Sequence, residues 1–227
     1  MPEAELIIGH DDRKGVFSKT RAFNDAFRRS HGDVIVLLDA DAYYSAEQIR
    51  SCATQLRAAR GRHQREWFIP YQFMYRLNQR ATKRLLESNP RQPVQFTYPA
   101  DPADVDGVDK AGYGKIFAAL TMILPWEAVE TVNRFDERFR GWGGEDVCFM
   151  RAVDLLWGKH HALRGGAFHL WHGNIGDDYD TREWSGQPGP RANNSHSLQY
   201  FQAVHDVKKM RKIVAGNRHE FRARDFM

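Results

Sequence analysis

The sequence predicts an α/β fold in which helices flank a mostly parallel sheet. Residues 34–38, VIVLL, form an unbroken apolar run that is typical of a strand buried on both faces. A second apolar run, residues 5–9, precedes it, and between the two runs apolar side chains recur at helical spacing: Ala22, Phe23, Ala26 and Phe27. Strand, helix and strand in close succession indicate a right-handed βαβ unit.

Caps, periodicity and breakers predict the other elements. Ser18 can cap the first helix, and Ser45 with Gln48 forms a capping box before a second helix. The apolar face of that second helix holds Ile49, Cys52, Ala53, Leu56 and Ala59. Further strands are predicted at residues 67–75, 117–124 and 167–172, and further helices at residues 76–86, 125–132, from about 145 onward, and 195–213. Residues 90–114 and 173–192 are predicted loops, and we expect the second to be mobile and to close over a ligand with Trp184.

Composition limits the classes of function. The 227 residues can bury one sizeable core, so we expect a single domain, and no apolar run approaches the ~20 residues that span a bilayer. The start of the chain has no signal-peptide pattern. Lys and Arg exceed Asp and Glu by only 33 to 29, which is weak evidence for a nucleic-acid binder but compatible with a phosphate-bearing ligand. Cys52 and Cys148 lie in apolar helical patterns, so buried thiols and a reducing cytoplasm are expected.

Two carboxylates follow the strand at residues 34–38. Asp39 and Asp41 flank a single small residue at the carboxyl end of this strand, where open α/β sheets bind their ligands. Carboxylates this close repel each other unless a cation lies between them, and hard oxygen ligands favour Mg²⁺ or Mn²⁺. The alternative is a simple turn, since Asp is common at strand ends. The run at residues 5–9 is similarly followed by Asp11 and Asp12.

A glycine-rich loop precedes a second pair of acids. Gly141, Gly143 and Gly144 surround Trp142, and the next helix begins near Glu145 and Asp146. Acids at this position face the positive end of the helix dipole, which is a sufficient structural reason for them.

Four segments together resemble one family of enzymes. They are SKTRAFNDAF, GDVIVLLDADAYYS, FDERFRGWGGEDVCFMRAV and FHLWHG. Over about residues 5–175 they resemble family 2-type glycosyltransferases of the GT-A fold, and the later segments are similar to β1,4-galactosyltransferases and polypeptide N-acetylgalactosaminyltransferases. The resemblance implies a Rossmann-like GT-A domain at residues 1–192, followed by a helical extension at residues 193–227. It also implies metal-dependent transfer of a sugar from a nucleotide-sugar, of the UDP class, to a glycan, protein or small-molecule acceptor.

The resemblance assigns a metal site. Asp39 would lie near the donor ribose, and Asp41 would bind Mn²⁺ or Mg²⁺ at the donor's two phosphates. His172 matches the family's metal-binding His, and His169 stands where galactosyltransferases have a metal-binding Met. The alternative for either His is a strand residue that is hydrogen-bonded in the core.

The resemblance also assigns the chemistry. Asp146 occupies the position of the catalytic base in inverting members, whereas retaining members resemble GWGGEN there, so inversion is expected. Trp142 would form part of the acceptor and sugar platform, with simple packing as its alternative. Glu145 would hold acceptor or donor hydroxyls, with a helix-start acid as its alternative.

One departure from the family concerns the amino-terminal region. The family's first βα unit, whose loop contacts the nucleotide base, has no counterpart, so Asp11 or Asp12 is expected to meet uracil and Arg21 to meet phosphate or base. The departure motivates a second hypothesis, a noncatalytic nucleotide- or sugar-binding relic of the fold. A third hypothesis, nucleic-acid binding through the basic carboxyl-terminal segment, has little support because the charge is modest and no reader motif is present. We therefore expect neither a nucleic-acid partner nor a membrane span.

Overall fold

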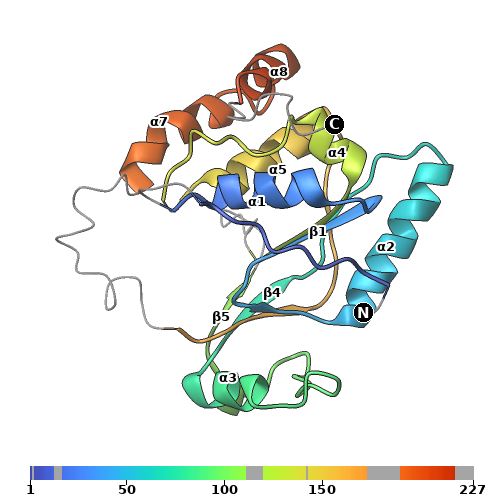
Figure 1. Ribbon diagram of the computed structural model, residues 1–227, viewed down its shortest axis with the longest axis vertical. Coiled ribbons are helices and arrows are strands. Elements are labelled where there is room, and N and C mark those ends of the chain that lie inside the picture. Colours follow the sequence, from blue (N-terminus) through green and yellow to red (C-terminus); the bar gives the residue numbers. More distant parts are fainter. Residues whose placement is uncertain (2, 13–16, 111–119, 142, 173–189, 218–227) are drawn as a thin grey trace. The chain divides into compact units, whose positions relative to one another are not determined.

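A computed structural model of the chain describes residues 1, 3–12, 17–110, 120–141, 143–172 and 190–217 (Figure 1). The fold is mixed α/β, and the chain forms two compact units. Unit 1 comprises Met1–Asp33, Pro125–Lys159 and Tyr179–Met227, and unit 2 comprises Val34–Leu124 and His160–Asp178. Among the described residues, no helix is both long enough and apolar enough to cross a membrane.

Unit 1 is built from helices. They are α1 (Lys19–Arg29), α4 (Trp126–Thr131), α5 (Glu145–Leu156), α7 (Pro190–Phe201) and α8 (Val207–Ala215). Helix α5 contacts α4, α7 and α8. Stacked aromatic rings fill the space between α1 and α5, with ring centroids 4.1 Å apart for Phe135 and Phe149 and 6.1 Å apart for Phe27 and Phe135. The core of this unit therefore lies around α5.

The start of α1 confirms the predicted cap, but the strand predicted before it is wrong. Ser18 Oγ accepts a hydrogen bond from the Arg21 amide, as an N-cap should. Residues 5–9 form no strand, and the side chains of Leu6 and Ile8 are 87% and 66% exposed. The backbone of this segment is bonded by α1 side chains instead of a neighbouring strand, because Arg29 donates to the Ile8 carbonyl and the His10 amide donates to Asp25. The predicted amino-terminal βαβ unit is consequently absent.

Unit 2 contains two small mixed sheets, so the predicted mostly parallel sheet is wrong. The first sheet has the order β1 (Val34–Leu38), β6 (Thr121–Pro125), β3 (Phe68–Ile69) and β7 (His161–Ala162). The second has the order β2 (Ala42–Tyr43), β8 (Gly166–His169), β4 (Phe73–Leu77) and β5 (Val105–Lys110). Strand β3 is antiparallel to β6 and parallel to β7. Strand β8 is antiparallel to β2 and parallel to β4, which is itself antiparallel to β5. A Rossmann-like arrangement is not established by these sheets.

The strand and helix that surround Asp39 and Asp41 lie where the sequence predicts them. In β1, Ile35 and Leu37 are buried but Leu38 is exposed, so the strand is not buried on both faces as expected. Helix α2 (Ala46–Gly61) packs beside β1 and begins after Ser45, whose side chain accepts from the Gln48 amide. Only half of the predicted capping box forms, because the Gln48 side chain donates to the carbonyls of Pro70 and Arg164 instead of returning to Ser45.

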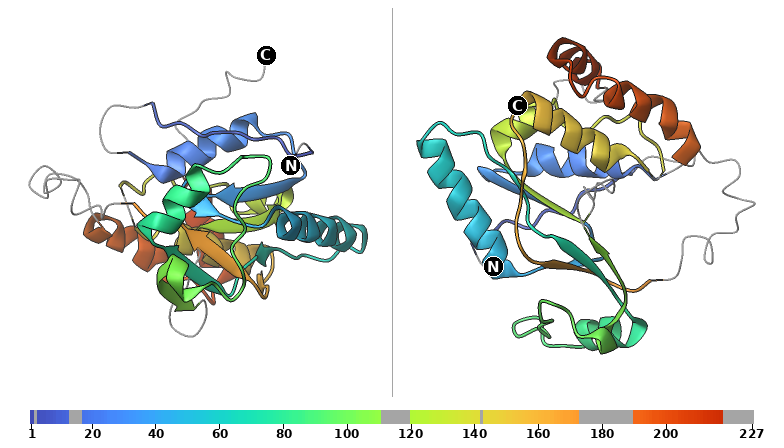
Figure 2. Two further views of the ribbon diagram at one scale, coloured as in Figure 1. Left: turned by 90° about the horizontal axis from the view of Figure 1, so that it is seen from below. Right: turned by 180° about the vertical axis from the view of Figure 1, so that it is seen from behind.

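Several predicted elements are divided or shifted. The strand predicted at residues 67–75 is interrupted near Pro70, which cannot donate a ladder hydrogen bond, and continues as β4. Helix α3 (Gln79–Leu86) begins after Asn78, later than predicted, and lies beside β4 (Figure 2). The predicted loop at residues 90–114 contains the 3₁₀ helix η1 (Pro102–Asp104) and strand β5. Strand β5 was missed because only its pairing with β4 gives its polar sequence VDGVDK a reason to be extended.

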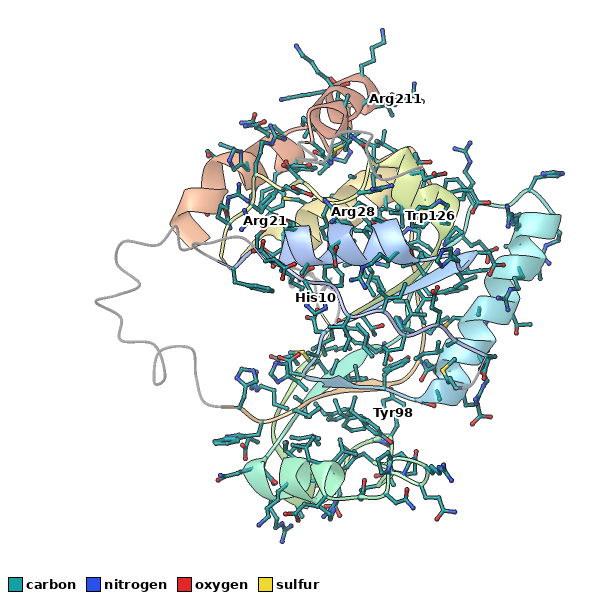
Figure 3. All side chains as sticks on the ribbon, in the orientation of Figure 1. His10, Arg21, Arg28, Tyr98, Trp126 and Arg211 are labelled. Atoms are coloured by element: carbon teal, nitrogen blue, oxygen red, sulfur yellow. The ribbon has the colours of Figure 1, made fainter. Side chains whose placement is uncertain are left out.

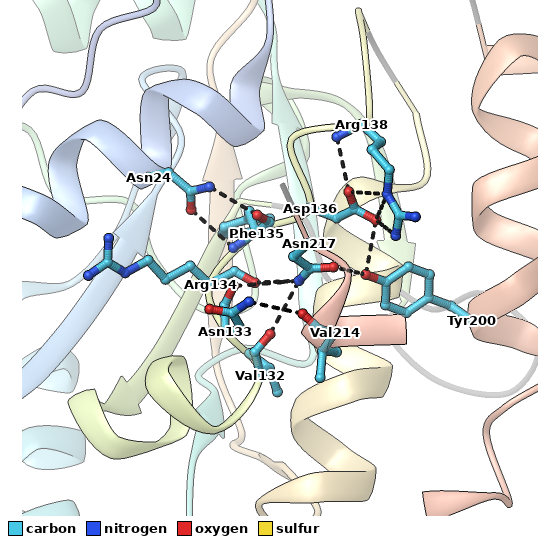
Figure 4. A network of polar contacts seen from close by, with 10 residues as sticks. All are labelled: Asn24, Val132, Asn133, Arg134, Phe135, Asp136, Arg138, Tyr200, Val214 and Asn217. Carbon is cyan, nitrogen blue, oxygen red and sulfur yellow. Dashed lines mark hydrogen bonds and ion pairs between the residues drawn. The ribbon is translucent and has the colours of Figure 1, made fainter. Parts of the chain in front are cut away.

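The carboxyl-terminal helix predicted at residues 195–213 is two helices. Asp206 ends the turn after α7 and caps α8 by accepting from the Lys209 amide. A polar network holds both helices to residues 132–138 (Figure 4). In it, Tyr200 Oη bonds to Asn217 at 3.0 Å and to Asp136 at 3.2 Å, and the Asn133 side chain donates to the Val214 carbonyl. Both helices therefore pack against the rest of unit 1.

Candidate metal centre

Unit 2 brings Asp41, His169 and His172 together. One carboxylate oxygen of Asp41 and one ring nitrogen of each histidine all lie within 4.8 Å of one another. Asp41 Oδ2 is 3.3 Å from His169 Nε2 and 3.4 Å from His172 Nε2, and the two imidazole ring centroids are 5.0 Å apart. All three side chains are partly exposed, so a ligand from solvent could reach them.

The pairing of β2 with β8 creates this arrangement. Ala42 lies opposite His169 in the antiparallel register, and the Leu170 amide donates to the Asp41 carbonyl at 2.7 Å. Asp41 itself lies in a tight turn closed by the Ala42 amide and the Asp39 carbonyl. After β8 the chain is fixed again, because the Trp171 amide donates to the buried Thr82 hydroxyl of α3 at 2.8 Å. Backbone bonds thus hold the chain on both sides of the cluster.

Asp41 and His169 shift each other's pKa in opposite directions. The hydrogen bond from His169 lowers the pKa of the Asp41 carboxyl below its ordinary value, against a smaller opposing effect of burial. The same contact raises the pKa of His169. A proton on His169 therefore stabilises the Asp41 carboxylate, and a cation bound at the same atoms would take the place of that proton.

The donor set fits a divalent transition metal. Ligand atoms that share one ion at about 2.1 Å lie roughly 3 to 3.5 Å from one another, and both Asp–His distances fall in that range. Two imidazoles and one carboxylate suit Mn²⁺, Fe²⁺ or Zn²⁺ better than Mg²⁺, which prefers oxygen ligands in octahedral geometry. Three protein ligands would leave coordination positions for substrate oxygens or water.

Asp39 is not one of the three clustered side chains, although its charge helps to raise the pKa of His169, and it is bonded to the backbone of residue 120. Its amide donates to the Leu120 carbonyl at 2.9 Å, and its carboxylate accepts from the Leu120 amide at 3.3 Å. Asp39 and Asp41 therefore take different surroundings despite their spacing in the sequence, and only Asp41 joins the histidines.

The acids predicted at the start of α5 have different environments in unit 1. Asp146 Oδ2 lies 2.9 Å from Lys19 Nζ of α1, and both side chains are mostly buried. Glu145 is also buried, and its carboxylate accepts from the Gly143 amide at 2.9 Å, closing the glycine loop. Glu145 thus has the contacts expected of its structural alternative, a helix-start acid. Trp142 lies outside the described residues, as do residues 173–189 of the predicted closing loop.

Of the amino-terminal residues predicted to contact the nucleotide, Asp11 and Arg21 are bonded to each other. The Arg21 guanidinium of α1 (labelled in Figure 3) pairs with the buried Asp11 carboxylate at 2.8 Å. Asp11 also accepts from the Ser18 amide at 2.8 Å, so it helps to fix the start of α1. Asp12 is exposed. Through these contacts Asp11 and Arg21 stabilise the start of α1, which is a structural role within unit 1.

Sequence reasoning missed one residue in each unit. In unit 1, Lys19 contacts the predicted site residue Asp146, and in unit 2, Thr82 bonds to the backbone of Trp171 between His169 and His172; both partners are far away in the sequence. Lys19 stands within the segment SKTRAFNDAF, but no local pattern there indicates a carboxylate partner.

Comparisons with models of known protein families and with curated protein sequences give no match to this chain.

Proposed function

We propose that the chain is a metal-dependent glycosyltransferase that moves a sugar from a UDP-sugar to an acceptor hydroxyl with inversion. The observation that supports the proposal is the meeting of Asp41, His169 and His172 in unit 2. The resemblance of the sequence to GT-A enzymes names these three residues for the metal, although Asp41 is far from both histidines in the sequence. The resemblance implies Mn²⁺ or Mg²⁺, and the two imidazoles of the donor set favour Mn²⁺ over Mg²⁺.

Each predicted site residue would have a separate role in the sugar transfer. A divalent cation at the cluster would neutralise charge on the departing diphosphate. Asp41, His169 and His172 would hold that cation, and Asp39 would orient the donor ribose. Asp146 would accept the proton of the attacking hydroxyl, a contribution typically worth ~10² to 10⁴-fold in rate. A carboxylate has several acceptor positions, so Asp146 can receive this proton while it keeps its contact with Lys19.

Thermal unfolding tests the metal and donor site. We expect Mn²⁺ to raise the melting temperature strongly only together with UDP, because phosphate oxygens would complete the coordination. Asp41→Ala should abolish the joint shift. Asp106→Ala is the matched control, since it removes an exposed carboxylate from β5 in the same sheet. A joint shift that survives in Asp41→Ala would exclude the assigned metal site.

Kinetics of an Asp146→Asn variant test the base. This change keeps the shape of the side chain but removes its capacity to take a proton, so transfer should fall by ~10² or more while the joint Mn²⁺ and UDP shift is retained. Glu145→Gln should weaken donor or acceptor binding and rate together if its proposed role is right, and only stability if its bond to Gly143 is its whole role. Near-normal transfer by Asp146→Asn, or a product with the donor's anomeric configuration, would contradict an inverting mechanism that uses this base.

A second candidate function is a noncatalytic nucleotide- or sugar-binding relic of the same fold. The observation that favours it is the buried ion pair of Asp11 and Arg21, because two residues assigned to the donor are bonded to each other. Incubation with UDP-sugars and Mn²⁺, read by release of UDP, separates the two candidates. Release of UDP supports the transferase, whereas a joint melting-temperature shift without any release supports the relic.

A further inference from the structure

The net positive charge of the protein is located at its carboxyl-terminal end. Residues 205–227 contain seven Lys or Arg and three Asp or Glu, an excess that equals the formal net charge of +4 for the whole chain. The preceding residues are therefore balanced in charge. The excess of positive charge therefore belongs to residues 205–227 and not to the protein as a whole.

Helix α8 presents its share of this charge to solvent in a fixed orientation. Lys208, Lys209, Arg211 and Lys212 are all exposed, whereas Met210 and Val214 of the same helix are buried in unit 1. Long side chains project from α8 away from the helices beneath it, with Arg211 labelled in Figure 3. The bonds of Asn133 to Val214 and of Asn217 to Tyr200 secure the end of the helix, so the cationic face cannot turn inward without breaking them.

No acid in the described part of the chain neutralises this face. The single acid among residues 190–217 is Asp206, whose side chain caps α8, and the Lys209 ammonium contacts the Gln202 amide oxygen at 3.4 Å. The basic face of α3 differs, because Arg84 pairs with Asp104 and Lys83 with Glu87. The cations of α8 therefore remain available for an anionic partner.

Apolar side chains are also exposed on α7 and at the start of α8. Leu198, Phe201 and Val207 are 52%, 41% and 40% exposed. Leu198 and Phe201 are three positions apart on α7 and so share one face of it, and Phe201 and Val207 border the turn between α7 and α8. Exposed apolar groups next to an unpaired basic helix are the composition of a surface that contacts lipid headgroups and the adjoining acyl region.

We infer that α8 and the end of α7 form a docking surface for a bilayer that contains anionic phospholipids. The four cations of α8 would contact headgroup phosphates and carboxylates, and Leu198, Phe201 and Val207 would enter the boundary of the acyl chains. A nucleic acid would satisfy the charges but would gain nothing from burying the aliphatic Leu198 and Val207. The inference rests on unit 1 alone and does not depend on transferase activity.

Cosedimentation of the full chain with vesicles tests the inference. We expect binding to vesicles of equal parts phosphatidylcholine and phosphatidylserine, little binding to phosphatidylcholine alone, and a steep loss of binding as salt is added. Each basic residue at such a surface contributes about fivefold in affinity, so Lys208→Glu combined with Lys212→Glu should reduce binding ~100-fold or more. Leu198→Gln should reduce it about fivefold through lost apolar burial, with an unchanged salt dependence.

The matched control is Arg80→Glu combined with Lys83→Glu on α3, which gives the protein the same net charge as the α8 variant. It should bind vesicles nearly as the unchanged protein does, and circular dichroism and melting temperature establish that all variants are folded. Absence of vesicle binding by the unchanged protein would overturn the inference. Equal losses in the α8 and α3 variants, or tighter binding to duplex DNA than to the anionic vesicles, would also overturn it.

Discussion

At the scale of single residues, burial holds both cysteine thiols in their protonated form. Removal from water raises the pKa of Cys52 to about 11 and that of Cys148 to about 12, and both thiols are free and buried as the sequence predicts. Because the thiolate is the reactive species, buried thiols with raised pKa values are chemically inert.

We therefore expect neither cysteine of the folded protein to react with iodoacetamide near neutral pH, and both to react in concentrated urea. Mass spectrometry of the intact protein measures the number of added groups. The sign of the pH effect follows from the same shifts: the folded state keeps protons that an unfolded thiol releases above its ordinary pKa of 9.0, so stability should decline as pH rises past that value. Rapid alkylation of either cysteine in the native protein would contradict its buried position.

At the scale of elements, one buried asparagine joins α1 to the segment before α5. The Asn24 side chain donates to the Phe135 carbonyl and to Glu137, both at 2.9 Å, and accepts from the Phe135 amide at 3.0 Å. Asn24 is fully buried, so water could not replace these bonds easily. Helix α1 is thus located by polar contacts as well as by the aromatic stack of Phe27 and Phe135.

Asn24→Ala should lower the free energy of unfolding by about 3 kcal/mol, because it leaves buried donors and acceptors unsatisfied. Urea denaturation followed by circular dichroism measures the change. Asn194→Ala on α7 is the control, since Asn194 is exposed and its removal should alter stability by less than about 0.5 kcal/mol. A loss below about 1 kcal/mol in Asn24→Ala would show that the network contributes little to stability.

At the scale of the whole molecule, each compact unit contains one buried cysteine. Cys52 lies in α2 of unit 2 and Cys148 in α5 of unit 1, and each unit has fully buried apolar side chains of its own, such as Ile123 in unit 2 and Val153 in unit 1. Proteins open in cooperative parts, so thiol labelling in mild denaturant can report the opening of each unit separately.

Val153→Ala, which removes buried methyl groups worth about 2 kcal/mol, should accelerate labelling of Cys148 roughly 30-fold more than labelling of Cys52. Ile123→Ala should have the reverse preference. Peptide mapping after timed labelling distinguishes the two thiols. Equal acceleration of both in either variant would mean that the two units open as one.

Local elements were predictable because their causes act within a few residues. Ser18 and Ser45 cap the helices that follow them, and the apolar face of α2 buries Ile49, Cys52, Leu56 and Ala59 as its spacing requires. Predicted boundaries were wrong where a second local signal was overlooked: Pro70 divides a predicted strand, and Asp206, which caps α8, separates α7 from α8. The strand predicted at residues 5–9 is wrong for a different reason, since an apolar segment forms a strand only when another strand pairs with it.

The sequence by itself determined where α1, α2 and α5 begin and that the cysteines of this protein are buried. Only the tertiary structure decided that the sheets are small and mixed, that Asp41 meets His169 and His172, and that Lys19 lies against Asp146. The physical reason is the range of the interactions. Helix capping and apolar periodicity depend on residues that are neighbours along the chain. Strand pairing and contacts between distant charges depend on the tertiary fold, which brings distant segments together, and no local pattern in the sequence encodes it.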